Sequence, residues 1–147
     1  MAEKILVTGG TGYIGSHTAV ELINAGHEVV IIDNLYNSDL SVLEGIRQIT
    51  GVKPDFHKID LCDGKRLEDF LGRHDDIDAV IHFAAYKAVG ESSEKPLMYY
   101  RNNILSTLNL LEAMVKFGIS SIVFSSSCTV YGQPDHLPVD ESAPVKE

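Results

Sequence analysis

The chain has 147 residues, a formal net charge of −9 and 44% hydrophobic residues, which fits one globular domain and leaves no room for a second full one. Its 12 basic residues stand singly or in pairs, so no basic stripe is present for nucleic acid or an anionic membrane. No apolar run approaches the ~20 residues of a membrane span, and the N-terminus lacks a secretory signal pattern. Neither a C-x-x-C spacing nor an Asn-x-Ser/Thr sequon occurs, so we expect a cytoplasmic protein with reduced thiols.

Short apolar segments alternate along the chain with segments of helical period, which predicts βαβ units and a parallel sheet. The expected strands are 5–7, 28–33, 55–59, 79–83 and 121–124. The third is the least apolar of them and is therefore expected at an edge. We predict an α/β fold of the Rossmann type, a doubly wound parallel sheet of about five strands with helices on both faces.

Three expected helices follow the first three strands. The first begins near Tyr13 and ends at Gly26, with an inward stripe of Ile14, Thr18, Leu22 and Ala25. The second ends at Gly51 and carries Val42, Leu43, Ile46 and Ile49. The third is capped by Asp63 and turns inward Leu67, Phe70 and Leu71.

The longest expected helix begins at Pro96, after a loop over 88–94, and ends at Gly118. Its apolar residues keep helical spacing for about five turns, and they are Leu97, Tyr100, Ile104, Leu108, Leu111 and Val115. This stripe is expected to be mostly core. Residues 128–147 contain three prolines and little periodicity, so we expect a loop there.

A glycine-rich turn follows the first strand. Two spacings overlap in it, Gly9-x-x-Gly12-x-x-Gly15 and Gly10-x-Gly12-x-x-Gly15. At a strand-to-helix turn such glycines permit positive φ, close approach of a pyrophosphate, and close packing of helix on strand. The phosphates would then lie at the N–H groups of the helix that begins near Tyr13. The alternative is a glycine-rich turn that binds no nucleotide.

An acidic residue, Asp33, ends the second strand about 18 residues after Gly15, close to the ~20 expected for a ribose-binding carboxylate. A carboxylate there can accept both ribose hydroxyls and would repel a 2′-phosphate, which favours NAD over NADP. Polar residues also follow the third, fourth and fifth strands, at Asp60, 83–87 and 125–127, so all five strand ends meet at one edge. For Asp60 a loop-capping role stays open, and Lys87 has the alternative of an ordinary surface lysine.

The histidines show no H-x-x-x-H or other paired spacing on one helix, so no metal site is expected. His82 is expected to be a buried, hydrogen-bonded strand residue. Cys62 and Cys128 are expected to be core or cleft-lining thiols.

Five stretches together resemble the extended short-chain dehydrogenase/reductases and, within them, the UDP-glucose (UDP-galactose) 4-epimerases. They are VTGGTGYIGSHT at 7–18, DNL at 33–35, HFAAYKAVGES at 82–92, YYRNN at 99–103 and FSSSCTVYG at 124–132. The first stretch indicates only the superfamily, whereas residues 87–92 and the serine cluster are much more specific to the epimerases. Two departures from the epimerase pattern are Ala85-Tyr86 in place of the frequent Gly-Leu, and Cys128 in place of the frequent Ala.

The resemblance implies NAD as cofactor, UDP-glucose and UDP-galactose as substrates, and a homodimer of the full-length enzyme to which the long helix contributes. It implies that Ser127 is the catalytic hydroxyl. The implied cofactor-binding residues are Gly9, Gly12, Tyr13, Ile14, Gly15, Asp33, Asn34, Leu35, Asn37, Ser38, Asp60, Leu61, Phe83, Ala84, Ala85, Tyr86, Lys87 and Asn102.

The base of this family is the tyrosine of a Tyr-x-x-x-Lys motif, whose lysine lowers the phenol pKa from its usual ~10. No such motif occurs in the 147 residues. We therefore expect residues 1–147 to be the NAD-binding domain of a longer epimerase, without the substrate domain and without turnover of its own. Two alternatives stay open: another NAD-dependent extended short-chain enzyme of nucleotide sugars, such as a dehydratase or decarboxylase, and a non-catalytic NAD-binding module.

Overall fold

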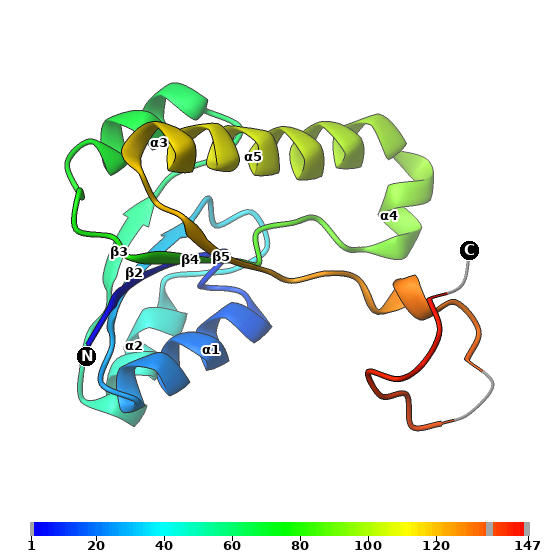
Figure 1. Ribbon diagram of the computed structural model, residues 1–147, viewed down its shortest axis with the longest axis horizontal. Helices are drawn as coiled ribbons and strands as arrows, with labels where there is room; N and C mark the ends of the chain where they lie inside the picture. Colours follow the sequence, from blue (N-terminus) through cyan, green and yellow to red (C-terminus); the bar gives the residue numbers. More distant parts are fainter. Residues whose placement is uncertain (1, 135–136, 146–147) are drawn as a thin grey trace.

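The computed structural model describes residues 2–134 and 137–145. Its centre is a five-stranded parallel sheet in the order β3-β2-β1-β4-β5 (Figure 1). The strands are β1 Lys4–Thr8, β2 Glu28–Asp33, β3 Asp55–Lys58, β4 Ala79–His82 and β5 Ser121–Phe124. The strand order reverses between β1 and β4, where ligands bind in doubly wound sheets. The predicted fold class is confirmed, and β3 lies at an edge as expected.

Helices cover both faces of the sheet (Figure 1). On one face α1 (Tyr13–Asn24) and α2 (Ser41–Thr50) enclose a core that includes Val7 and Ile31. On the other face α3 (Gly64–Leu71) and α5 (Pro96–Phe117) enclose a second core. None of the helices among the described residues is both long and apolar enough to cross a membrane.

The predicted helix ends are largely confirmed. The Asp63 side chain accepts a hydrogen bond of 3.1 Å from the N–H of Arg66 and so caps α3. Gly51 and Gly118 follow α2 and α5 with φ of 76° and 74°, the left-handed conformation that ends helices.

The predicted inward stripe of α1 is wrong except at Leu22. Ile14 is 50% exposed, and the buried residues of the helix are Gly15 and Ala19, with Leu22 and Ile23 packed beside them. Small residues let α1 lie close to the sheet, and a count of large apolar residues does not detect them. Similarly, α2 turns Leu43 and Ile46 inward, while Ile49 is 69% exposed.

The expected loop over 88–94 is a short helix, α4 (Val89–Glu94). Its glycine and two serines are weak helix formers, so no helix is predicted from the residues of this segment. The Glu91 carboxylate accepts hydrogen bonds from Lys95 Nζ and from the Tyr99 hydroxyl, and both residues lie in or next to α5. These contacts hold α4 against α5. A second short helix, η1 (Cys128–Tyr131), interrupts the tail that was expected to be a loop throughout.

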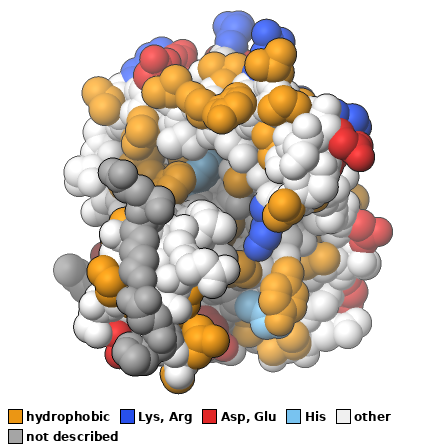
Figure 2. Space-filling model, turned by 90° about the vertical axis from the view of Figure 1, so that its right-hand side faces the viewer, with side chains coloured by type: hydrophobic (Ala, Val, Ile, Leu, Met, Phe, Trp, Pro, Cys, Tyr) orange, Lys and Arg blue, Asp and Glu red, His pale blue; other side chains and the backbone are white. Residues whose placement is uncertain are grey.

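The predicted stripe of α5 is not core in this chain. Leu97, Ile104, Leu108 and Val115 are each at least half exposed. The helix buries another face, made of Tyr99, Ser106, Leu110, Ala113 and Met114. Figure 2 shows hydrophobic side chains gathered along the top of the molecule, where α5 lies in Figure 1.

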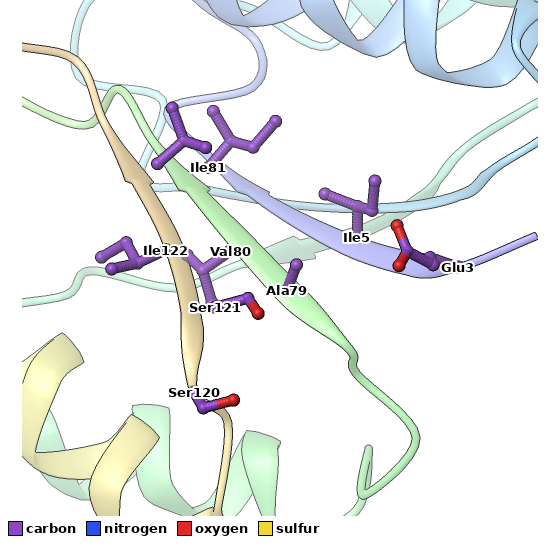
Figure 3. A pocket seen from close by; sticks show the side chains of 9 residues that line it. Glu3, Ile5, Ala79, Val80, Ile81, Ser120, Ser121 and Ile122 are labelled. Carbon is purple, nitrogen blue, oxygen red and sulfur yellow. The ribbon is translucent and has the colours of Figure 1, made fainter.

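The sheet is also open beside β5. A hollow of about 450 Å³ lies along β1, β4 and β5 and is lined by residues such as Ile5, Ile81 and Val123 (Figure 3). Val123 is 61% exposed, because no described helix covers this part of the sheet. The hollow includes none of the predicted cofactor residues.

Candidate dinucleotide site

The glycine turn packs tightly at the point where the strand order reverses. Gly9 has φ of 69°, and its N–H donates to the carbonyl of Ile32 at 2.8 Å. A Cβ on Gly9 would lie 2.7 Å from the backbone nitrogen of Ala84, directly after β4. A Cβ on Gly15 would overlap the carbonyl oxygen of Gly9. Only glycine fits at both positions, so the turn brings the start of α1 against the ends of β1 and β4.

The first turn of α1 is open to a ligand. Its N-cap, Gly12, provides no side-chain cap, whereas Asp63 caps α3. Tyr13 is 82% exposed and Ile14 is 50% exposed, so neither side chain fills the turn. A helix N-terminus without a side-chain cap can donate its N–H groups to an anionic ligand such as a pyrophosphate.

Asp33 faces the glycine turn from the end of β2. Its Oδ2 accepts from the N–H of Thr11 at 3.2 Å, and its Oδ1 accepts from the N–H of Leu35 at 2.8 Å. The Ser38 hydroxyl donates to Oδ1 at the longer distance of 3.4 Å and lies 2.7 Å from the Thr11 hydroxyl. Leu35 has φ of 61°, so the Asp33 hydrogen bond holds it in a conformation that is rare for leucine.

Asp60 follows β3 and joins this group of residues. Its Oδ2 accepts from the Asn34 side chain at 3.3 Å, and its Oδ1 accepts from the N–H of Cys62 at 2.9 Å. Asp60 therefore does cap its own loop, the alternative that the sequence left open, and also contacts the loop after β2. The neighbouring Leu61 is 4% exposed and belongs to the core, so its side chain does not face the site.

The segment after β4 is tied to α5 by an asparagine that the sequence analysis missed. Asn103 accepts from the N–H of Tyr86 at 2.8 Å and donates to the Tyr86 carbonyl at 2.9 Å. It also accepts from the side chain of the predicted residue Asn102, at 2.9 Å. A pair of adjacent asparagines in a helix was the available signal, since one of them can fix the loop while the other stays beside the site.

Aromatic rings join the loops after β2 and β4. The ring centroids of Tyr36 and Tyr86 are 4.5 Å apart, and those of Tyr86 and Tyr99 are 5.6 Å apart. Burial raises the pKa of the Tyr86 phenol, so this group stays protonated at neutral pH. Burial likewise raises the pKa of the Cys62 thiol, which makes Cys62 a poor nucleophile.

His82 lies beneath the site and is 3% exposed. Its Nδ1 is 2.7 Å from the Thr8 hydroxyl, and its Nε2 is 3.3 Å from the Thr107 hydroxyl. Burial lowers its pKa, so the ring is neutral at pH 7. The expectation of a buried, hydrogen-bonded histidine is confirmed.

Some predicted residues have few contacts with this group. Asn37, Ala85 and Lys87 are exposed, and Phe83 packs partly against the core beneath α1.

Ser127 is exposed after β5. Its Oγ accepts from the N–H of Thr129 at 3.2 Å and lies 2.7 Å from the Thr129 hydroxyl, so it caps η1. The Cys128 side chain lies outside the described part of the structure.

The fold and this site define a doubly wound α/β protein with the architecture of a dinucleotide-binding domain. The family model described as "NAD dependent epimerase/dehydratase family" matches residues 5–147. The chain belongs to this family.

Several relatives are UDP-glucose 4-epimerases. The enzyme of Bacillus subtilis is 52% identical over 141 residues, which are 96% of this chain and 41% of that protein. A Stenotrophomonas maltophila UDP-glucose 4-epimerase solved with NAD and formylated UDP-arabinopyranose superposes with a TM-score of 0.89 at 52% identity, covering 98% of this chain and 43% of that one. The Bifidobacterium longum enzyme, solved with NAD+ and UDP, superposes with a TM-score of 0.89 at 47% identity, covering 97% of this chain and 42% of that one. The chain thus spans about two fifths of the length of these relatives.

Proposed function

We propose that residues 1–147 form the NAD-binding domain of a UDP-glucose 4-epimerase, which interconverts UDP-glucose and UDP-galactose. The observation that carries this proposal is the pairing of the uncapped N-terminus of α1 with the Asp33 carboxylate directed at the same turn. The two features match the two charged or polar parts of the ligand, a pyrophosphate and a ribose diol. The named relatives with bound NAD support the same cofactor.

Each part of the site has a proposed role toward NAD. The N–H groups at Tyr13 and Ile14 would bind the pyrophosphate, at the positive end of α1. Asp33 would accept the ribose hydroxyls, one of which replaces the long hydrogen bond from Ser38. The remaining predicted residues, from Asn34 through Asn102, would line the cofactor, Leu61 by its backbone alone because its side chain belongs to the core.

Ser127 is the proposed catalytic hydroxyl. NAD held by the N-terminus of α1 and by Asp33 would supply reversible hydride transfer at C4 of the sugar. The Ser127 hydroxyl would hydrogen-bond the sugar oxygen while charge moves through it. In the free chain this hydroxyl is exposed and bonded only locally to Thr129 among the described residues, so it is accessible to a substrate.

Cofactor binding is tested on the 147-residue polypeptide itself. The purified protein is denatured, the supernatant is assayed enzymatically for NAD, and the stripped, refolded protein is titrated with NAD by calorimetry. We expect one NAD per chain in either measurement. Because the 147 residues contain no Tyr-x-x-x-Lys, we also expect this polypeptide alone to give no UDP-galactose turnover. A folded protein that neither carries nor binds NAD would contradict the proposal.

Epimerase activity is tested with a chimera. The part of this chain that matches the Bacillus subtilis enzyme, 52% identical over 141 residues, replaces its counterpart in that enzyme. The chimera should convert UDP-galactose to UDP-glucose. In the chimera, Ser127→Ala should lower kcat by roughly 10²–10³ while NAD stays bound, because one donor to the developing charge is lost. Ser126→Ala is the matched control. A chimera that folds, binds NAD and has no activity would argue for a different nucleotide-sugar enzyme.

The exposed face of α5 supports a homodimer. Tyr100, Ile104, Leu108, Leu111 and Val115 are between 40% and 83% exposed and follow one another at helical spacing. A contiguous apolar face of this kind marks a protein interface. We propose that α5 packs against the same helix of a second copy.

A further inference from the structure

A cluster of metal-ligating side chains lies away from the dinucleotide site. Asp55 is the first residue of β3 and His57 is the third, so both side chains point to the same face of the sheet. His74 follows α3, and its N–H donates to the carbonyl of Leu71 at 3.1 Å. Each of these three residues offers one ligand atom, and the three atoms all lie within 4.8 Å of one another.

Both imidazoles are held in place by the same phenyl ring. The centroid of Phe70 is 4.7 Å from that of His57 and 4.1 Å from that of His74, and the two imidazole centroids are 4.9 Å apart. Phe70 is 1% exposed, so this support is rigid. The Asp55 side chain, in contrast, is 53% exposed, and the cluster opens to solvent on its side.

The tautomer of His74 suits a metal ligand. Its Nδ1 lies 2.9 Å from the carbonyl oxygen of Phe70, which can only accept a hydrogen bond. Nδ1 therefore carries the proton, and Nε2 presents its lone pair 3.9 Å from Asp55 Oδ2. Histidines that bind metals commonly donate their other N–H to a backbone carbonyl in this way.

The distances lie near those of a coordination site. His57 Nε2 is 3.0 Å from Asp55 Oδ2. Ligand bonds of about 2.1 Å in a tetrahedral zinc site place neighbouring ligand atoms about 3.4 Å apart. The pair of His57 and Asp55 is about 0.4 Å closer than this spacing, and a small rotation of the exposed Asp55 carboxylate or of the His74 ring would adjust it and bring in the third ligand.

We propose that Asp55, His57 and His74 bind a divalent first-row transition ion of the Zn²⁺ type, with water at the fourth position. Two imidazoles and one carboxylate favour such an ion over Mg²⁺ or Ca²⁺, which prefer oxygen ligands. The ion ties the edge strand β3 to the end of α3. The spacing of histidines in the sequence did not predict this metal site, because His57 and His74 come from separate elements. The Asp-x-His pattern of β3 was the one local sign of two ligands on the same face of a strand. This inference does not depend on the proposed function.

The site is tested by titrating the polypeptide, freed of any polyhistidine tag, with Zn²⁺ in a calorimeter. We expect one Zn²⁺ per chain and a rise in Tm of roughly 5 °C at saturating zinc, because the ion binds only the folded site. His57→Gln and His74→Gln should each weaken binding at least about tenfold. His27→Gln should change nothing, since the contacts of His27 are with Glu3, whose N–H donates to Nδ1 at 3.3 Å and whose carboxylate lies 3.9 Å away, and no second imidazole is grouped with it among the described residues.

A measurement on the unaltered chain covers the case in which a variant fails to fold. Long-range ¹H–¹⁵N spectra of the imidazoles should show the His74 proton on Nδ1 without metal. Added Zn²⁺ should then shift the Nε2 signals of His57 and His74 and leave those of His27 in place. No zinc binding, or binding that leaves the His57 and His74 signals unmoved, would overturn the site.

Discussion

Gly15, in the first turn of α1, lies so close to Gly9 that a Cβ added to it would overlap the Gly9 carbonyl oxygen and lie 2.9 Å from Gly10 Cα. Both atoms belong to the backbone, so neither can rotate away. The spacing of the first and last glycines is thus set by the packing of α1 on the end of β1. The same packing directs the N-terminus of α1 at the proposed pyrophosphate.

Gly15→Ala should therefore destabilise the fold by about 1–3 kcal/mol, the usual cost of overpacking, and should abolish NAD binding. Gly45→Ala is the matched control. Gly45 lies inside α2 with nothing within 4 Å of an added Cβ, so the alanine should stabilise the protein by roughly 0.5–1 kcal/mol. Urea unfolding followed by circular dichroism measures the stability change of each variant. Equal stability of the two variants would show that α1 can move away from the turn.

Asp33→Asn tests the ribose carboxylate. Asparagine can still accept a hydrogen bond from the N–H of Leu35, so the loop is retained, but the charge is lost. NAD affinity should fall by about 10–100-fold, the value of a hydrogen bond to a charged group. NADP should lose less, because its 2′-phosphate is no longer repelled, so the ratio of the two Kd values moves toward one. Calorimetric titration with each nucleotide gives that ratio.

Asp39→Asn is the control for this change. Asp39 lies in the same loop and accepts from the N–H of Ser41 at 2.6 Å, without a contact to the glycine turn among the described residues. It should leave both nucleotide affinities unchanged. If Asp33→Asn preserves the wild-type preference for NAD over NADP, the carboxylate does not read the ribose.

His82 should make stability depend on pH. Burial lowers its pKa in the folded state below the ordinary value of 6.5, so the unfolded chain binds this proton more readily. The stabilisation is complete above about pH 6.5 and is lost as the pH falls through that value toward the folded pKa, by at most ~1.4 kcal/mol per pH unit. Urea unfolding at a series of pH values should show a smaller acid loss for His82→Gln than for the wild type. His17→Gln, at an exposed position of α1, should keep the wild-type slope.

Local chemistry explains how much of the fold the sequence predicted. Apart from β3, the strands are apolar runs bounded by turn residues, and the glycine turn depends on residues that are neighbours in the chain, so both were found. The caps at Asp63, Gly51 and Gly118 are likewise local. The short helix α4 was missed because contacts with α5 hold it, through Glu91 and Tyr99, and not the propensity of its own residues.

The parts of the sites that went unpredicted depend on tertiary contacts. Asn103 acts on Tyr86, which is 17 positions away, and His74 meets His57 only when α3 packs on β3. The buried face of α5 was predicted wrongly for a related reason. Periodicity finds an apolar stripe but does not say what covers it, and the face that packs on the sheet includes Ser106 and Ala113, which a search for large apolar residues passes over.

Leu108→Glu tests the proposed dimer. Leu108 is 50% exposed, and it lies midway along a face that extends about 23 Å from Tyr100 to Val115, since a helix rises 1.5 Å per residue. A buried, unpaired carboxylate at its centre should shift the protein from dimer to monomer, as measured by light scattering on a sizing column at several concentrations. Ile49→Glu is the matched control, because Ile49 is a 69% exposed apolar residue on α2, away from that face. It should leave the dimer intact. Since Leu108 is already exposed within one chain, its replacement should leave the urea midpoint of the monomer nearly unchanged. A loss of monomer stability without a change in mass would instead assign the α5 face to packing inside one chain.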